Sequence, residues 1–302
     1  MKFSVSLPRP DGTAETGIPA VVAVARAAEA AGFDAVSVTD HPFPFLGDGS
    51  VSHRAYDPFI VQAFVAAATE RIRLHFSLLV ACHRNPFLTA QMIATLDEAS
   101  NGRTIVGVGA GYNRTEIEAL GGEFARRGPH VDEVVTAMHK AWSGAPVHDR
   151  SDRWTAAGNQ MFPVPGRESH PPLWRGGNSR TAVRSAASHF DGWAPLEVPD
   201  PTVATLAGTT ALTVAELPDA VAGFREAWRA AGRTGDPEIC FVRSWPNWLT
   251  DPATIEADVA AIGAAGATWI EFTLAGITHH EHLESVENTS ATLRAAGIMT
   301  TA

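Results

Sequence analysis

Cysteine and long apolar runs are both scarce in this chain of 302 residues. The two cysteines, Cys82 and Cys240, cannot build a disulfide framework, and their separation does not match a metal-ligand pair. Such cysteine usage is typical of a reducing compartment, so we expect a cytoplasmic protein. No apolar run approaches the ~20 residues of a membrane helix. We therefore expect no membrane partner.

Basic residues are also fewer than acidic residues. The chain has 23 lysines and arginines against 33 aspartates and glutamates, which gives a formal net charge of -10. A protein with this balance repels polyanions, so we expect no nucleic-acid partner. Any small anionic ligand must be held locally, by a cluster of arginines and backbone N–H groups.

Short β-branched segments alternate with helical patterns along the whole chain. The expected strands are 3–7, 35–39, 73–80, 104–108, 172–175, 192–194, 238–242 and 269–274. The expected helices are 18–31, 58–69, 87–99, 114–120, 131–142, 179–188, 214–230, 255–265 and 282–296, and 147–166 is expected to be an insertion. Eight alternating units without a linker predict one α/β domain over residues 1–302, a (β/α)8 TIM barrel with insertion loops at its C-terminal face.

A glycine-rich stretch, 100–114, joins the fourth expected strand to a helix. Gly107, Gly109 and Gly111 remove side chains where the strand ends, which lets a flat or anionic ligand approach the backbone. Asn113 is expected to cap the following helix. The alternative is a tight turn in which small residues are needed only for packing.

A second glycine-rich loop follows the fifth expected strand. It consists of Arg175, Gly176, Gly177, Asn178, Ser179 and Arg180. The two glycines allow backbone N–H groups to converge, and the Asn or Ser opens a helix whose N-terminus favours anions. The two arginines add donors for phosphate oxygens. The alternative is a plain turn with solvated arginines, but barrels often bind phosphate after their later strands.

The second expected strand ends at Asp40 and His41, just before Pro42. Active sites of barrels lie at the carboxyl ends of their strands. We expect these two titratable side chains either to act as an acid/base pair or to bind the edge of a cofactor. The alternative is a capped turn.

Three residues near other strand ends are candidate substrate contacts: His83, Trp245 and Glu271. Trp245 either walls an aromatic pocket or packs a loop. Glu271 has the parity of an inward-pointing residue, and a buried carboxylate needs a partner.

Metal ligands are not expected. The run 279–282 is rich in histidine, but its residues are adjacent and fall in an expected loop. His75 lies inside a strand and is expected to be a hydrogen-bonded core histidine. A metal-dependent hydrolase built on Asp40, His41, His75 and Glu271 remains an alternative, although the first strand has no His-x-His pair.

Several motifs together resemble one family. They are residues 28–34, 40–41, 84–86, 96–103, 107–113, 171–177 and 186–193. The chain resembles the luciferase-like monooxygenases, in particular the branch that uses coenzyme F420, a deazaflavin. The resemblance implies an oxidoreductase that transfers a hydride between the deazaflavin and a small organic substrate. The alternatives are an FMN-dependent monooxygenase that uses reduced flavin and oxygen, and a flavin-binding protein without catalysis.

The resemblance also implies roles for individual residues. Asp40 matches a position beside the ring, His41 a residue used in catalysis or substrate contact, and 77–78 a non-proline cis peptide behind the ring. The predicted cofactor-binding residues are Asp40, Ser77, Leu78, Gly109, Ala110, Gly111, Asn113, Arg175, Gly176, Gly177, Asn178 and Ser179, and the predicted catalytic residues are His41 and Asp40. Sugar-phosphate dehydrogenases of this branch carry a catalytic Glu where Ala110 stands, so their chemistry is not implied.

Two further expectations concern surfaces. Deazaflavin has a long anionic tail, and Arg84, Arg114, Arg175 and Arg180 are expected to form a basic track for it. Family members usually pair, so a homodimer through helices 58–69 and 87–99 is expected by analogy.

Overall fold

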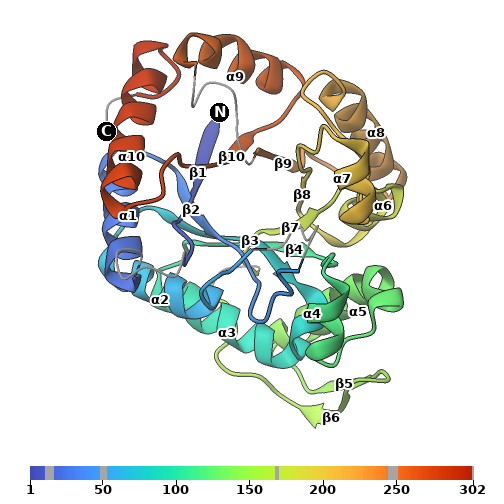
Figure 1. Cartoon of the computed structure of the whole chain (residues 1–302). Helices are drawn as coiled ribbons and strands as arrows, with labels where there is room; N and C mark the ends of the chain where they lie inside the picture. Colours follow the sequence, from blue (N-terminus) through green and yellow to red (C-terminus); the bar gives the residue numbers. More distant parts are fainter. Residues whose placement is uncertain (11–16, 48–52, 167–169, 244–250, 301–302) are drawn as a thin grey trace.

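Eight parallel strands close into a barrel (Figure 1). The computed structural model describes residues 1–10, 17–47, 53–166, 170–243 and 251–300. Around the barrel the strands follow the order β1 (Lys2–Ser6), β10 (Trp269–Thr273), β9 (Glu238–Arg243), β8 (Gly192–Ala194), β7 (Leu173–Gly176), β4 (Thr104–Gly109), β3 (Arg73–Val80) and β2 (Ala35–Val38). The predicted (β/α)8 barrel is therefore confirmed.

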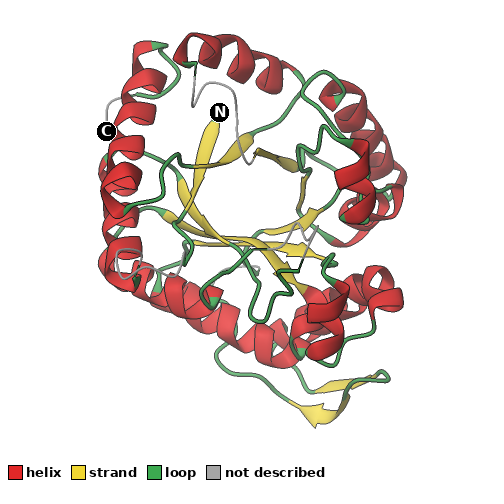
Figure 2. Ribbon diagram, in the orientation of Figure 1, coloured by secondary structure: helices red, strands yellow, loops and turns green. Residues whose placement is uncertain are grey.

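Helices surround the barrel as an outer ring (Figure 2). They are α1 (Ile18–Ala30), α2 (Pro58–Ala68), α3 (Pro86–Ala99), α4 (Arg114–Ala119), α5 (Arg127–Trp142), α6 (Arg180–His189), α7 (Pro201–Leu206), α8 (Leu217–Ala230), α9 (Ile255–Ala264) and α10 (His279–Ala295). Local sequence explains several of the starts. Asp57 and Asn85 each accept two backbone N–H bonds, and a proline follows each of them at the first helical position.

The start of α10 corrects one expectation. Thr278 and Glu281 form a reciprocal capping box, so the helix begins at His279. The histidine-rich run 279–282 is its first turn, and the prediction of a loop there was wrong.

The barrel interior changes from apolar to polar along its axis. A cluster of strand residues alone fills one part, with the indole rings of Trp174 and Trp269 5.4 Å apart. The alternation of side chains along β10 then turns Glu271 inward as well. The opposite faces of the strands pack against the helices in a larger cluster.

The expected insertion contains an antiparallel hairpin outside the barrel (Figure 1). Its strands are β5 (Val147–Arg150) and β6 (Thr155–Asn159). Lys140 of α5 pairs with Asp149 at 2.5 Å, and Arg126 pairs with Asp152 at 2.6 Å. The hairpin is thus held along the outer side of α5.

Two further findings bear on the expectations from composition. Both cysteines are free and buried. Among the described residues, no helix is long and apolar enough to cross a membrane.

Candidate active site

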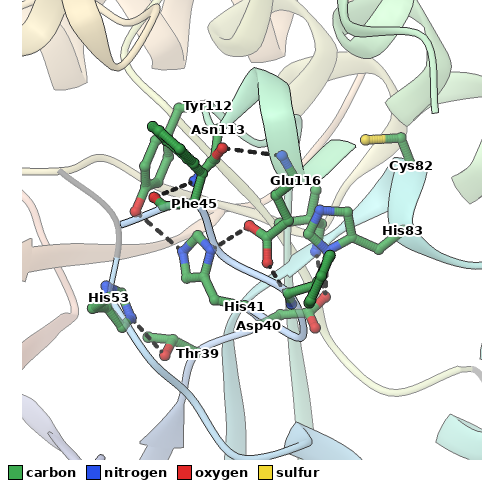
Figure 3. A network of polar contacts seen from close by, with 12 residues as sticks. Thr39, Asp40, His41, Phe45, His53, Cys82, His83, Tyr112, Asn113 and Glu116 are labelled. Carbon is green, nitrogen blue, oxygen red and sulfur yellow. Dashed lines mark hydrogen bonds and ion pairs between the residues drawn. The ribbon is translucent and has the colours of Figure 1, made fainter. Parts of the chain in front are cut away.

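A buried polar network lies at the carboxyl ends of β2 and β4, and His41 is at its centre (Figure 3). The Nδ1 atom of His41 lies 2.8 Å from Oε2 of Glu116, and its Nε2 atom lies 3.1 Å from Oη of Tyr112. His41 and Glu116 are both buried. The second oxygen of Glu116 accepts a bond from the backbone N–H of Phe43 at 3.0 Å.

Asn113 explains why these segments meet. Its side-chain oxygen accepts from the N–H of Glu116 at 3.1 Å, so it caps α4 as predicted. Its amide group donates to the carbonyl oxygen of Phe45 at 3.1 Å. One side chain therefore fixes both the start of α4 and the loop after β2.

His53 lies against the other side of His41. The two rings meet edge to face with centroids 4.6 Å apart, and Nε2 of His53 lies 2.9 Å from Oγ1 of Thr39. Burial, and then the charges of Arg9 and His41, lower the pKa of His53 to about 3. His53 is thus a neutral neighbour at physiological pH.

The side chain of Asp40 contacts a different set of residues. Its Oδ2 accepts from Nη1 of Arg84 at 2.6 Å and from the N–H of Val80 at 3.0 Å. Burial alone would raise its pKa, but the nearby His83 and the hydrogen-bonded, charged Arg84 outweigh this and lower the pKa to about 2. The carboxylate that pairs with His41 is consequently Glu116 and not Asp40.

His83 lies beneath the surface. Its side chain is 1% exposed, and its Nδ1 atom is 3.7 Å from Oδ2 of Asp40. A substrate contact requires exposure that this side chain lacks, so the structure places His83 behind the site as a partner of Asp40.

Glu271 occupies the polar part of the barrel interior. It accepts a bond from Ser37 at 2.6 Å and a second from Ser77. Burial raises its pKa to about 7, although both hydroxyl bonds act in the opposite direction. Its side chain is 6% exposed. It is therefore an internal carboxyl group, and the expected substrate contact does not fit its position.

His75 has the core role expected of it. Its Nδ1 atom lies 3.1 Å from Oγ of Ser4, and its ring is fully buried. Burial lowers its pKa to about 3. Across the part of the chain that the structure describes, no three His, Cys, Asp or Glu side chains converge as metal ligands would.

Leu78 explains most of the bare glycine positions. The peptide bond between Ser77 and Leu78 is cis, at the place the resemblance indicates. A β-carbon on Gly107 would lie 2.6 Å from Cδ2 of Leu78, and one on Gly109 would lie 3.1 Å from Cδ1. Gly176 faces the same side chain. These glycines make room for a leucine, so the packing alternative holds for them.

Gly111 and Ala110 contribute their backbone atoms to the turn after β4. Gly111 has a φ of +79°, which an L side chain rarely adopts, and a β-carbon there would lie 2.7 Å from Cγ1 of Val80. The carbonyl oxygen of Ala110 lies 3.7 Å from Sγ of Cys82. Both positions belong to the turn that sets Tyr112 and Asn113 at the barrel mouth.

The second glycine loop is partly occupied by protein contacts. Gly177 has a φ of +109°, and its N–H donates to the carbonyl of Ala194 at 3.3 Å. The N–H of Asn178 donates to Oγ1 of Thr209 at 3.0 Å, and its side-chain amide binds backbone groups of nearby segments. These two N–H groups are therefore not the free donors that the sequence predicts.

The open donors of this loop lie one turn further on. Ser179 caps α6 by accepting from the N–H of Ala182 at 3.2 Å. The N–H groups of Arg180 and Thr181 precede the first intrahelical bond and have no acceptor among the described residues, so they can meet an anion.

Three of the four arginines expected to form a basic track are engaged by protein groups, and the fourth, Arg180, is exposed at the start of α6. Arg175 is buried and donates to the carbonyl oxygens of Val108 and Gly176, and burial lowers its pKa to about 10. Arg84 is paired with Asp40, and Arg114 pairs with Glu118 on α4 at 3.1 Å.

The predicted substrate contact Trp245 lies outside the described residues.

The sequence did not identify three residues of this network: Glu116, Tyr112 and His53. Glu116 stands three residues after the cap Asn113, where a glutamate is usually explained by helix capping. The hydroxyl of Tyr112 sits in the recognised motif but has no local signature. The pairing of β2, β3 and β4 and the path of the loop after β2 bring them to His41.

The family model described as luciferase-like monooxygenase matches residues 1–295. The chain belongs to this family. An uncharacterised protein of Mycobacterium tuberculosis strain H37Rv is 29% identical over 240 residues, which are 75% of this chain and 79% of that protein. An F420-dependent glucose-6-phosphate dehydrogenase of Nocardia farcinica is 31% identical over 180 residues, which are 57% of this chain and 52% of the dehydrogenase.

Two solved structures share the fold. Monooxygenase RslO1 from Streptomyces bottropensis has a TM-score of 0.78 at 20% identity, over 98% of this chain and 99% of its own. An F420-dependent secondary alcohol dehydrogenase, solved with an F420-acetone adduct, has a TM-score of 0.77 at 17% identity, over 97% of this chain and 99% of its own. These named proteins are oxidoreductases, and at such identities the likeness carries the fold alone.

Proposed function

We propose that this luciferase-like protein is a coenzyme F420-dependent oxidoreductase that transfers a hydride between the deazaflavin and a small organic substrate. One observation carries the proposal. His41 is held between a buried carboxylate and a tyrosine hydroxyl at the carboxyl end of the barrel, where enzymes of this architecture do their chemistry. F420-dependent relatives at 29% and 31% identity support the choice of cofactor.

The residues at the barrel mouth suit a flat ring with an anionic tail. The half-buried side chain of Leu78, packed on bare glycines, offers an apolar surface for a ring. The first turn of α6 offers free N–H groups for a phosphate. The buried Arg175 guanidinium has an Nε atom without a hydrogen-bond partner in the part of the chain that the structure describes, and it adds positive potential to the turn of Gly177.

Bound deazaflavin would supply or accept the hydride at its ring. The protein's own part is to orient the substrate and to hold a proton. His41 is suited to the proton because an imidazole can accept a proton at one ring nitrogen while the other nitrogen donates a hydrogen bond. Asp40 fixes the backbone of the β2 and β3 ends through Val80 and Arg84, which keeps His41 in place.

An FMN-dependent monooxygenase is the second candidate. The family description and the close match in fold to RslO1 favour it. The apolar surface at Leu78 and the N–H groups of α6 suit FMN equally well. A flavin-binding protein without catalysis differs from both in showing binding and no turnover.

Titration of the purified protein with each cofactor tests the proposal. We expect coenzyme F420 to bind at least about tenfold more tightly than FMN, a difference of about 1.4 kcal/mol. A panel of secondary alcohols and carbonyl compounds, followed by deazaflavin absorbance, then identifies the substrate. Tighter binding of FMN, with oxygen uptake by the reduced flavin, would establish the monooxygenase instead.

We also propose a homodimer formed through α2 and α3. Ile60 and Phe64 lie one turn apart on α2 and are 57% and 56% exposed, and Leu88 of α3 is 53% exposed. Exposed apolar side chains on neighbouring helices are typical of an interface. Phe64→Glu should halve the mass measured by light scattering, whereas Leu206→Glu on α7 should not. A monomeric wild type would refute this proposal.

A further inference from the structure

The two bonds of His41 define its tautomer. The Glu116 carboxylate can only accept, so Nδ1 of His41 carries the hydrogen in the 2.8 Å bond. In the neutral ring Nε2 is then an acceptor, and the hydroxyl of Tyr112 donates to it across 3.1 Å. Figure 3 shows the three side chains in this order, with Tyr112 at one end and Glu116 at the other.

Glu116 cannot turn away easily. Its other oxygen is held by the N–H of Phe43, and its own backbone is fixed by the cap at Asn113. Its side chain is 1% exposed. A carboxylate held at both oxygens is a rigid acceptor, and rigid acceptors fix the tautomer of a histidine.

Other titratable groups face this trio from several loops. His53 contacts the ring of His41 from the loop after β2, and burial with neighbouring charges keeps it neutral. Arg9, in the loop after β1, acts electrostatically on His53 and Tyr112, and burial lowers its pKa. Asp40 precedes His41 but is paired with Arg84.

Tyr112 is the outermost member of the trio. It is half-buried, whereas His41 and Glu116 are buried. A molecule at the barrel mouth would meet the phenol before the imidazole. We propose that Tyr112 is a catalytic residue that exchanges the substrate proton, and that Glu116 is the positioning residue that keeps His41 ready to receive it. This inference rests on the proposed hydride transfer and adds the route of the proton.

The step balances for the oxidation of an alcohol. Oxidised deazaflavin, when bound, would accept the hydride that leaves the substrate carbon, and a C=O bond would replace the C–O single bond. The substrate hydroxyl gives its proton to Oη of Tyr112 while the phenolic hydrogen moves to Nε2 of His41. The resulting imidazolium is stabilised by the Glu116 carboxylate. Reduction of a carbonyl runs the same transfers backwards.

The tautomer is measurable without cofactor. Nitrogen-15 NMR of histidine-labelled protein, with His41→Gln to identify the signal among 12 histidines, should show the Nδ1–H form. In Glu116→Gln the side chain has one acceptor oxygen and one NH2 donor in place of two acceptor oxygens. The NH2 group can donate to Nδ1 of His41, so the population of the Nε2–H tautomer should increase. Glu118→Gln, an exposed acid on the same helix, is the matched control and should change nothing. A wild-type signal in the Nε2–H form would overturn the role of Glu116, even if the variant fails to fold.

Kinetics test the role of Tyr112. With oxidised coenzyme F420 and the secondary alcohol that the wild type oxidises fastest, Tyr112→Phe should lower kcat roughly 10²–10⁴-fold and leave cofactor affinity unchanged. Glu116→Gln should lower kcat by about tenfold or more with little change in KM. Full kcat in Tyr112→Phe across the pH range would overturn the inference. If the wild type oxidises no alcohol and reduces no carbonyl, the proposed function fails, and the NMR result still decides the role of Glu116.

Discussion

The side chain of Leu78 occupies the space that a β-carbon on Gly176 would fill. Gly176 lies on β7 and Leu78 on β3, on either side of β4 in the barrel. The backbone of Gly176 is in a strand and not in the left-handed region, so alanine is allowed there by its own conformation. Any cost of a side chain at this position therefore comes from Leu78.

Gly176→Ala should lower the free energy of unfolding by about 1–3 kcal/mol, the usual cost of overpacking. In a Leu78→Ala background the same change should cost at least about 0.5 kcal/mol less, because the two sites couple. Urea denaturation measures both values. Gly223→Ala on α8, where a β-carbon meets open space, is the control and should be neutral or stabilising. An equal cost in both backgrounds would mean that something other than Leu78 opposes the side chain.

Glu271 should make stability fall as pH rises through the weakly acidic range. Its pKa is about 7 in the folded protein against an ordinary value of 4.5, so the folded state keeps a proton that the unfolded chain loses. The penalty is absent below about pH 4.5 and grows to at most about 3 kcal/mol by pH 7. Glu271→Gln should flatten this slope, and Glu287→Gln on the surface should not. A slope that is unchanged in Glu271→Gln would assign the titration to another group.

Asp40 should act in the opposite direction. Its pKa is lowered from 3.8 to about 2, so its stabilising effect is present above about pH 4 and is lost as pH falls through 2. Asp40→Asn should cost about 3–5 kcal/mol at neutral pH, because it leaves the Arg84 charge without its buried partner. Thermal unfolding between pH 2 and pH 7 measures this, with Asp152→Asn as the exposed control. The loss should shrink at the acid end, and a loss that is constant with pH would count against the ion pair.

Arg103 should be needed for the fold and not for chemistry. Its guanidinium donates to the carbonyls of Ala66, Thr69 and Ile72, and so ties the end of α2 to the start of β3. Lysine lacks the planar fork, so Arg103→Lys should cost about 2 kcal/mol or more. Arg71→Lys, at an exposed position of the same connection, should cost less than about 0.5 kcal/mol. Chemical denaturation compares the two, and equal costs would show that the fork is unimportant.

The barrel was predictable because its signals are local. Alternating β-branched segments and helical patterns mark each unit, and the cap at Asn113 follows from its own sequence. The alternation of side chains along β7 could also be predicted from the sequence. Because Trp174 points into the barrel, Arg175 must face the helices. The prediction placed Arg175 at the phosphate turn because it weighed the nearby glycines more heavily than the period of two.

The partners of His41 could not be predicted in the same way. Glu116 lies 75 residues from His41 in sequence, and their meeting depends on the loop after β2 reaching α4. Leu78 of β3 likewise fills space beside β4 and β7, and β7 is a neighbour in the sheet although it is remote in sequence. Such contacts are set by the register between strands and not by any short motif.

The β5–β6 hairpin gives the protein its only pair of open sheet edges among the described residues, because the main sheet closes on itself. Open edges invite other chains to add strands, and this is a common start of aggregation. Here β5 carries His148, Asp149 and Arg150 in succession, and Asp149 is held by Lys140 and Trp154. A strand arriving at this edge would have to strip charges of both signs from water, so the sequence of the hairpin protects the protein in concentrated solution.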